Sequence, residues 1–101
     1  MKKNLTTIFD DAGQLNAIVL HKDFKTNDIE FFTSDSQQMQ LGYMKRDRGY
    51  KIEPHIHNQV TRTINTSCEC LFIKTGRVEI YFYDLEKKPI CSEVVSAGDT
   101  I

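Results

Sequence analysis

The clearest β-hairpin pattern in the chain is residues 68–84, CECLFIKTGRVEIYFYD. A turn signal at Gly76 separates two runs that are rich in the β-branched and aromatic residues typical of strands. Residues two apart in a strand point to the same side. One face of the second run is therefore entirely apolar and consists of Val78, Ile80 and Phe82. The pattern predicts a hairpin with strands over residues 68–74 and 77–84.

Similar β-prone runs recur along the rest of the chain and are separated by turn residues. They lie at residues 5–9, 15–20, 29–33, 39–44, 50–57 and 90–95. No segment has the 3.6-residue periodicity of an amphipathic helix. Short strands at this spacing predict an all-β fold, with an antiparallel sandwich or barrel as its architecture.

Length and composition indicate one ordinary globular domain over residues 1–101. The chain is 40% hydrophobic and 27% charged, which excludes a disordered or collagen-like segment. Thirteen Lys and Arg against fourteen Asp and Glu give a net charge of −1, so no basic surface for nucleic acid is expected. No apolar run approaches the ~20 residues of a membrane span, and no signal-peptide core follows Lys2 and Lys3. We therefore expect a cytoplasmic protein that binds neither nucleic acid nor membrane.

The three cysteines are expected to be reduced and structural. Cys68 and Cys70 are two apart in a predicted strand, which places them poorly for bridging each other, and Cys91 is the remaining thiol. We expect Cys68 and Cys70 to behave as small buried hydrophobic residues. A zinc site on the cysteines is a weaker alternative, because the chain has no Cys-x-x-Cys pair.

The candidate metal ligands are His55, His57 and Glu69. Two histidines at positions i and i+2 of a strand point the same way, about 6.5–7 Å apart, and can converge on one ion. Glu69 shares its predicted face with the apolar Leu71 and Ile73, where an ionised carboxylate is costly unless it is paired. Two imidazoles and a carboxylate form a facial set suited to divalent Zn, Mn, Ni or Fe. In the alternative interpretation, each histidine only makes a hydrogen bond at a surface turn.

The spacing around this pair resembles the first motif of the cupin superfamily. Gly49 is followed after five residues by His55, then by His57, and Glu69 is followed after six residues by Gly76. The resemblance implies that His55, His57 and Glu69 bind the metal and that both glycines occupy turns. It also implies a cupin-like antiparallel β barrel, that is, a jelly roll or double-stranded β-helix. Residues 40–99 are similar in particular to small single-domain bacterial cupins of unassigned activity.

Two departures from the cupin pattern have consequences. A longer stretch than usual, residues 58–68, separates His57 from Glu69, and Arg62 within it could hold an anion at a cavity mouth. The second cupin motif, which supplies a fourth ligand, would begin at Gly98, yet the sequence stops at Ile101. We therefore expect a single domain that is truncated before this motif and incomplete at its C-terminal side. Alternatively, a second copy completes the sheet, which predicts a homodimer.

The expected function is binding of, or action on, a small polar molecule with the help of one divalent metal ion. The resemblance favours isomerase or epimerase chemistry on a sugar-related compound, without naming a catalytic residue. A non-catalytic binding module, a structural barrel and a metal-dependent dioxygenase stay open as alternatives. Arg62 and Tyr43 are the candidate contacts to this ligand, Tyr43 through its hydroxyl group.

Overall fold

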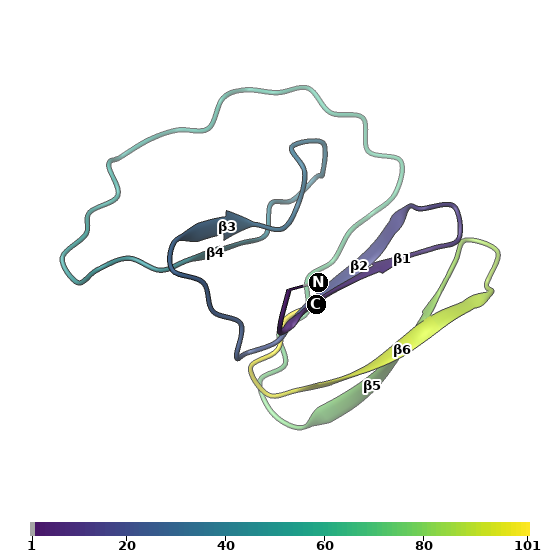
Figure 1. The fold of residues 1–101 in the computed structure, drawn as a ribbon. Helices are drawn as coiled ribbons and strands as arrows, with labels where there is room; N and C mark the ends of the chain where they lie inside the picture. The colour runs from purple at the N-terminus through teal and green to yellow at the C-terminus, as the bar shows by residue number, and fades with distance from the viewer. Residues whose placement is uncertain (1) are drawn as a thin grey trace. The chain divides into compact units, whose positions relative to one another are not determined.

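The computed structural model describes residues 2–101, and these residues form an all-β fold without a helix, as predicted (Figure 1). Six short strands form three separate antiparallel pairs, so the described residues contain no closed barrel. The pairs are β1 (Leu5–Phe9) with β2 (Leu15–Leu20), β3 (Ile29–Phe31) with β4 (Gly42–Met44), and β5 (Arg77–Tyr83) with β6 (Pro89–Ser96).

The chain divides into two compact units. Unit 1 contains residues 2–24 and Cys70–Ile101, and therefore holds β1, β2, β5 and β6. Unit 2 contains Lys25–Glu69, with β3 and β4. Unit 2 is thus a continuous segment of sequence, whereas unit 1 is assembled from both ends of the described chain.

The core of unit 1 follows from the alternation of side chains along its strands. Ile8 of β1 and Val19 of β2 point to one face of their pair and are 4% and 0% exposed. Phe82 of β5 and Val95 of β6 complete the same buried cluster. Full burial of such a side chain contributes about 1.5–3 kcal/mol to the free energy of unfolding. These four residues therefore make the main apolar contribution to the stability of unit 1.

Residues 98–101 form the centre of a second backbone ladder in unit 1. Thr100 bridges Leu20 on one side and Phe72 on the other. The Leu20 N–H donates to the Thr100 carbonyl oxygen at 2.8 Å, and the Leu71 N–H donates to the Ile101 carbonyl oxygen at 2.8 Å. This short extended segment therefore joins β2 to residues 71–73.

The predicted hairpin over residues 68–84 is wrong in its pairing. Gly76 does lie in a turn, with φ +86°, but residues 71–73 pair with residues 99–101 and β5 pairs with β6. Asp84 favours the observed hairpin, because its Oδ1 accepts hydrogen bonds from the backbone N–H groups of Glu86 and Lys88 at 2.9 and 2.8 Å. A turn stabilised in this way selects the sequence neighbour as partner of β5.

Unit 2 has less regular structure than the sequence predicts. The strands predicted at residues 29–33 and 39–44 are only three residues long each, and residues 50–57 form no strand. Pro54 lies in the middle of that last segment and lacks the N–H group that a ladder requires. Every residue from 44 to 72 is exposed, so the apolar positions of this stretch do not form the expected buried face.

Candidate functional site

The two candidate histidine ligands lie next to each other in unit 2. The ring centroids of His55 and His57 are 5.3 Å apart, and the ring planes meet at 61°. Both side chains are exposed, and Ile56 between them is 93% exposed. The segment is irregular, so the proximity of the rings arises without the predicted strand. The same separation suits an ordinary edge-to-face contact between aromatic rings.

One hydrogen bond indicates the tautomer of His55. Its Nδ1 lies 2.9 Å from the Glu53 carbonyl oxygen. A carbonyl oxygen can only accept a hydrogen bond, so Nδ1 must carry the proton and donate. In the neutral ring this leaves the lone pair on Nε2, the nitrogen that faces away from Glu53. An imidazole oriented by a backbone carbonyl in this way is typical of metal-ligating histidines.

The structure does not bring the third candidate ligand into one group with the histidines. Among residues 2–101, no three His, Cys, Asp or Glu side chains lie close enough together to hold an ion. Glu69 is exposed and lies in no strand, so the expectation that it occupies a core-facing position is wrong. Parity along a strand cannot place a residue in a segment that forms none.

Arg62, the candidate anion contact, is held by the backbone of unit 2. Its guanidinium group donates to the carbonyl oxygens of Gln37 and Asp35, the second at 3.4 Å. The Gln38 side chain donates in turn to the Thr66 carbonyl oxygen at 2.5 Å. These bonds tie the long stretch after His57 to the turn that follows β3.

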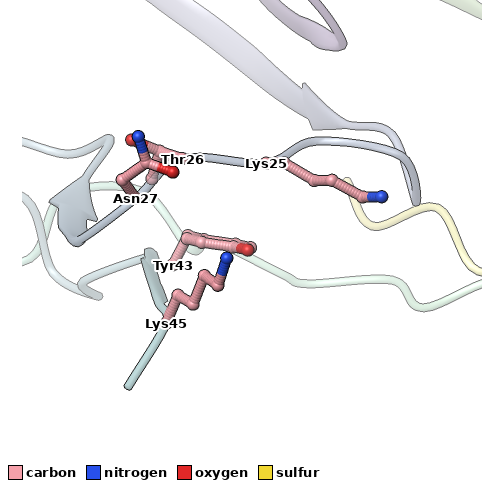
Figure 2. A pocket seen from close by; sticks show the side chains of 5 residues that line it. All are labelled: Lys25, Thr26, Asn27, Tyr43 and Lys45. Carbon is pink, nitrogen blue, oxygen red and sulfur yellow. The ribbon is translucent and has the colours of Figure 1, made fainter. Parts of the chain in front are cut away.

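Tyr43, the other candidate ligand contact, lines a pocket of about 600 Å³ in unit 2 (Figure 2). The other lining residues are Lys25, Thr26, Asn27 and Lys45. Sequence reasoning singled out only Tyr43. Lys45 carried a usable signal, because it lies two residues after Tyr43 and so projects to the same side of an extended segment.

Asp99 is a buried carboxylate whose role the sequence did not indicate. It is 4% exposed and accepts hydrogen bonds from the backbone N–H groups of Lys22 and Ser96, both at 2.8 Å. His21 Nδ1 lies 3.6 Å from its Oδ2. Burial alone would raise the pKa of Asp99, but the hydrogen bonds from Ser96 and Lys22 and the charge of His21 outweigh it and hold that pKa below its ordinary value.

Tyr81, Cys68 and Cys70 are not among the residues that line the pocket. Tyr81 on β5 is 60% exposed, and its hydrogen bond to Glu79 together with the charge of that carboxylate raises the pKa of the phenol. The expectation that Cys68 and Cys70 are buried is wrong, because both are exposed, and they are free thiols as predicted. Within residues 2–101 there is no helix long and apolar enough to cross a membrane.

A comparison of the chain with protein-family models, with curated proteins and with solved structures finds no significant match. Functional arguments for this chain therefore depend on its own residues.

Proposed function

We propose that the chain is a cupin-like protein that binds one divalent metal ion through His55 and His57 and, near it, a small polar molecule. The observation that carries the proposal is the 5.3 Å separation of the two imidazole rings. Two imidazoles on one tetrahedral ion, each with its nitrogen about 2.0–2.1 Å from the metal, have centroids roughly 5 Å apart. The observed spacing therefore needs little rearrangement to accept an ion.

The hydrogen bond at Glu53 supports the same proposal. Since His55 Nδ1 donates to the Glu53 carbonyl oxygen, Nε2 is available as a ligand without a change of tautomer. The exposure of both rings gives an ion direct access from solvent. A bound divalent ion would supply Lewis-acid chemistry by polarising a carbonyl or hydroxyl oxygen of the ligand.

The cupin-like spacing of Gly49, His55, His57, Glu69 and Gly76 extends the proposal to Glu69 as a third ligand and to a barrel architecture. A homodimer is part of the proposal for a different reason, because a second copy would complete the sheet. Zn, Mn, Ni and Fe are all compatible with a donor set of two imidazoles and one carboxylate. The histidine pair is the minimal form of the site, and Glu69 is the addition that a variant can test separately.

The test is a titration of the purified 101-residue chain with Zn(II) and Co(II), followed by elemental analysis after gel filtration. We expect about one equivalent of retained metal, lost in both His55→Ala and His57→Ala. Ile56→Ala is the matched control, because its side chain lies between the two ligands and is almost fully exposed. Glu69→Gln should weaken retention if this carboxylate completes the set.

Three results would overturn the proposal. The first is a parent chain that retains no metal after reconstitution, and the second is metal retention that survives in both histidine variants. Binding lost equally in Ile56→Ala would also contradict it, because the loss would then follow from the conformation of the segment and not from the imidazoles.

A further inference from the structure

The pocket lined by Tyr43 is a second, chemically distinct feature of unit 2, and we call it the Lys25–Lys45 pocket. It is bounded by Lys25, Thr26 and Asn27, which precede β3, and by Tyr43 and Lys45 at the end of β4. In Figure 2 the ammonium group of Lys45 reaches toward the phenol oxygen of Tyr43. Neither His55 nor His57 lines this pocket, so its ligand does not depend on the proposed metal site.

The lining of the pocket favours an anion. The five lining residues carry two ammonium groups, one side-chain amide and two hydroxyl groups, and none of them is acidic. Ammonium, amide and hydroxyl groups all donate hydrogen bonds. Charge-assisted hydrogen bonds to an oxyanion are about twice as strong as neutral ones. The pocket therefore combines positive charge with a surplus of donors.

The acid nearest to the lining residues in sequence, Asp28, forms an ion pair with Arg46. Asp28 directly follows Asn27, and its Oδ1 lies 2.6 Å from Nη1 of Arg46. The guanidinium of Arg46 lies over the Tyr50 ring, 4.9 Å from its centroid. This ion pair offsets the charge of the carboxylate that follows Asn27.

The β3–β4 pair holds the two sides of the pocket together. Glu30 pairs with Tyr43 in its register, and the Lys45 N–H donates to the Asp28 carbonyl oxygen at 3.3 Å. These backbone bonds fix β4, which carries Tyr43, and the following residue Lys45 against the segment that follows Asn27. The lysine side chains keep their freedom, but the positions from which they extend are set before a ligand arrives.

We propose that the Lys25–Lys45 pocket binds the phosphate group of a small organic phosphate monoester. Such a group carries a charge of about −1.5 to −2 at neutral pH and three acceptor oxygens. It therefore matches two cations and several neutral donors better than a carboxylate, which has a single charge. The volume of about 600 Å³ lies within the usual range of small-molecule pockets and leaves room for the organic part of the ligand.

The experiment titrates the full 101-residue chain with glycerol 3-phosphate and follows backbone amide resonances by NMR. Glycerol, glycerate and inorganic phosphate are titrated in parallel, and they represent the organic part alone, a carboxylate of similar size and the free anion. We expect saturable shifts at residues 25–27 and 43–45 that are clearly strongest with glycerol 3-phosphate. The affinity should fall as the salt concentration rises, because both lysines are exposed.

Three variants test which residues are responsible. Lys25→Ala and Lys45→Ala should each weaken the affinity for glycerol 3-phosphate by at least about fivefold, because each removes one charge-assisted donor. Lys51→Ala is the matched control, since this lysine is exposed in the same unit and does not line the pocket. All three side chains are exposed, so the variants should keep the fold of the parent.

Several outcomes would overturn this inference. Shifts that do not saturate, or that weaken as much in Lys51→Ala as in the pocket variants, would show only a diffuse response to charge. Glycerate binding as tightly as glycerol 3-phosphate would overturn the preference for phosphate, and equally tight inorganic phosphate would overturn the monoester. The His55→Ala chain should bind glycerol 3-phosphate as the parent does, so failure of the metal proposal and failure of this one can be distinguished.

Discussion

Unit 1 buries Ile8, Val19, Phe82 and Val95 in one cluster, whereas unit 2 buries none of its large apolar side chains. The candidate functional groups have the opposite distribution, because His55, His57 and both lysines of the pocket belong to unit 2. Segments with few buried contacts open at low free-energy cost, and binding residues are often found in such segments. The comparison indicates that unit 1 supplies most of the stability and that unit 2 carries the sites.

The largest expected difference between the units is in amide hydrogen exchange. The N–H groups of Leu20, Leu71 and Thr100 are hydrogen-bonded in the ladder of unit 1 and should open only on global unfolding. Amides of residues 55–60 have no strand partner and are exposed. We expect protection factors that differ by at least about a thousandfold, measured by exchange followed by NMR. Equal protection in both segments would contradict the division of stability.

Asp99→Ala should produce the next largest effect. The substitution leaves the N–H groups of Lys22 and Ser96 without their buried acceptor, and we expect a loss of about 2–4 kcal/mol in the free energy of unfolding. Asp84→Ala is the matched control, because this carboxylate also accepts two backbone N–H groups but is only partly buried, in a surface turn. Its cost should stay within about 1 kcal/mol. Urea denaturation of the three chains measures both values.

A pair of apolar truncations tests the same division through packing. Val19→Ala removes two methyl groups from a fully buried side chain and should cost about 2 kcal/mol. Val60→Ala makes the identical change in unit 2, where Val60 is 64% exposed, and should stay within about 0.5 kcal/mol. If the two variants unfold at the same urea concentration, unit 2 must possess a buried core of its own.

The smallest expected effect is the pH dependence contributed by Asp99. Its pKa is lower in the folded chain than its ordinary value of 3.8, so the unfolded chain binds this proton more readily. The stabilisation is therefore complete above pH 3.8 and is lost as the pH falls through the folded pKa. The free energy of unfolding, measured at a series of pH values from 6 down to 2, should accordingly fall more steeply for the parent than for Asp99→Asn. Identical pH profiles would contradict this assignment.

Local sequence signals were sufficient for part of the fold. The strands predicted at residues 5–9 and 15–20 are confirmed, because the turn residues between them, including Gly13 with φ +78°, impose the hairpin. The pairing of residues 71–73 was not predictable in this way. Their partners, residues 99–101, are distant in sequence, and alternation of side chains carries no information about which strands become neighbours.

The candidate sites show the same limit. The rings of His55 and His57 lie 5.3 Å apart, but the strand from which their common direction was predicted is not formed, and the predicted position of Glu69 also depended on a strand that is not formed. Gly98 and Asp99 were visible as a turn signal. The burial of Asp99, however, results from contact with Lys22 and Ser96, and contacts of this kind depend on the tertiary structure.

The backbone ladder around Thr100 also has a consequence for the order in which parts of the chain fold during synthesis. The contact between Lys22 and Asp99 spans 77 positions, and the backbone bonds from residues 98–101 to β2 span a similar distance. A growing polypeptide leaves the ribosome from its N-terminus, so the β1–β2 hairpin emerges well before residues 98–101, with which β2 pairs. Contacts of such high sequence separation are slow to form. During synthesis, β2 therefore lacks its backbone partner until residues 98–101 have left the ribosome.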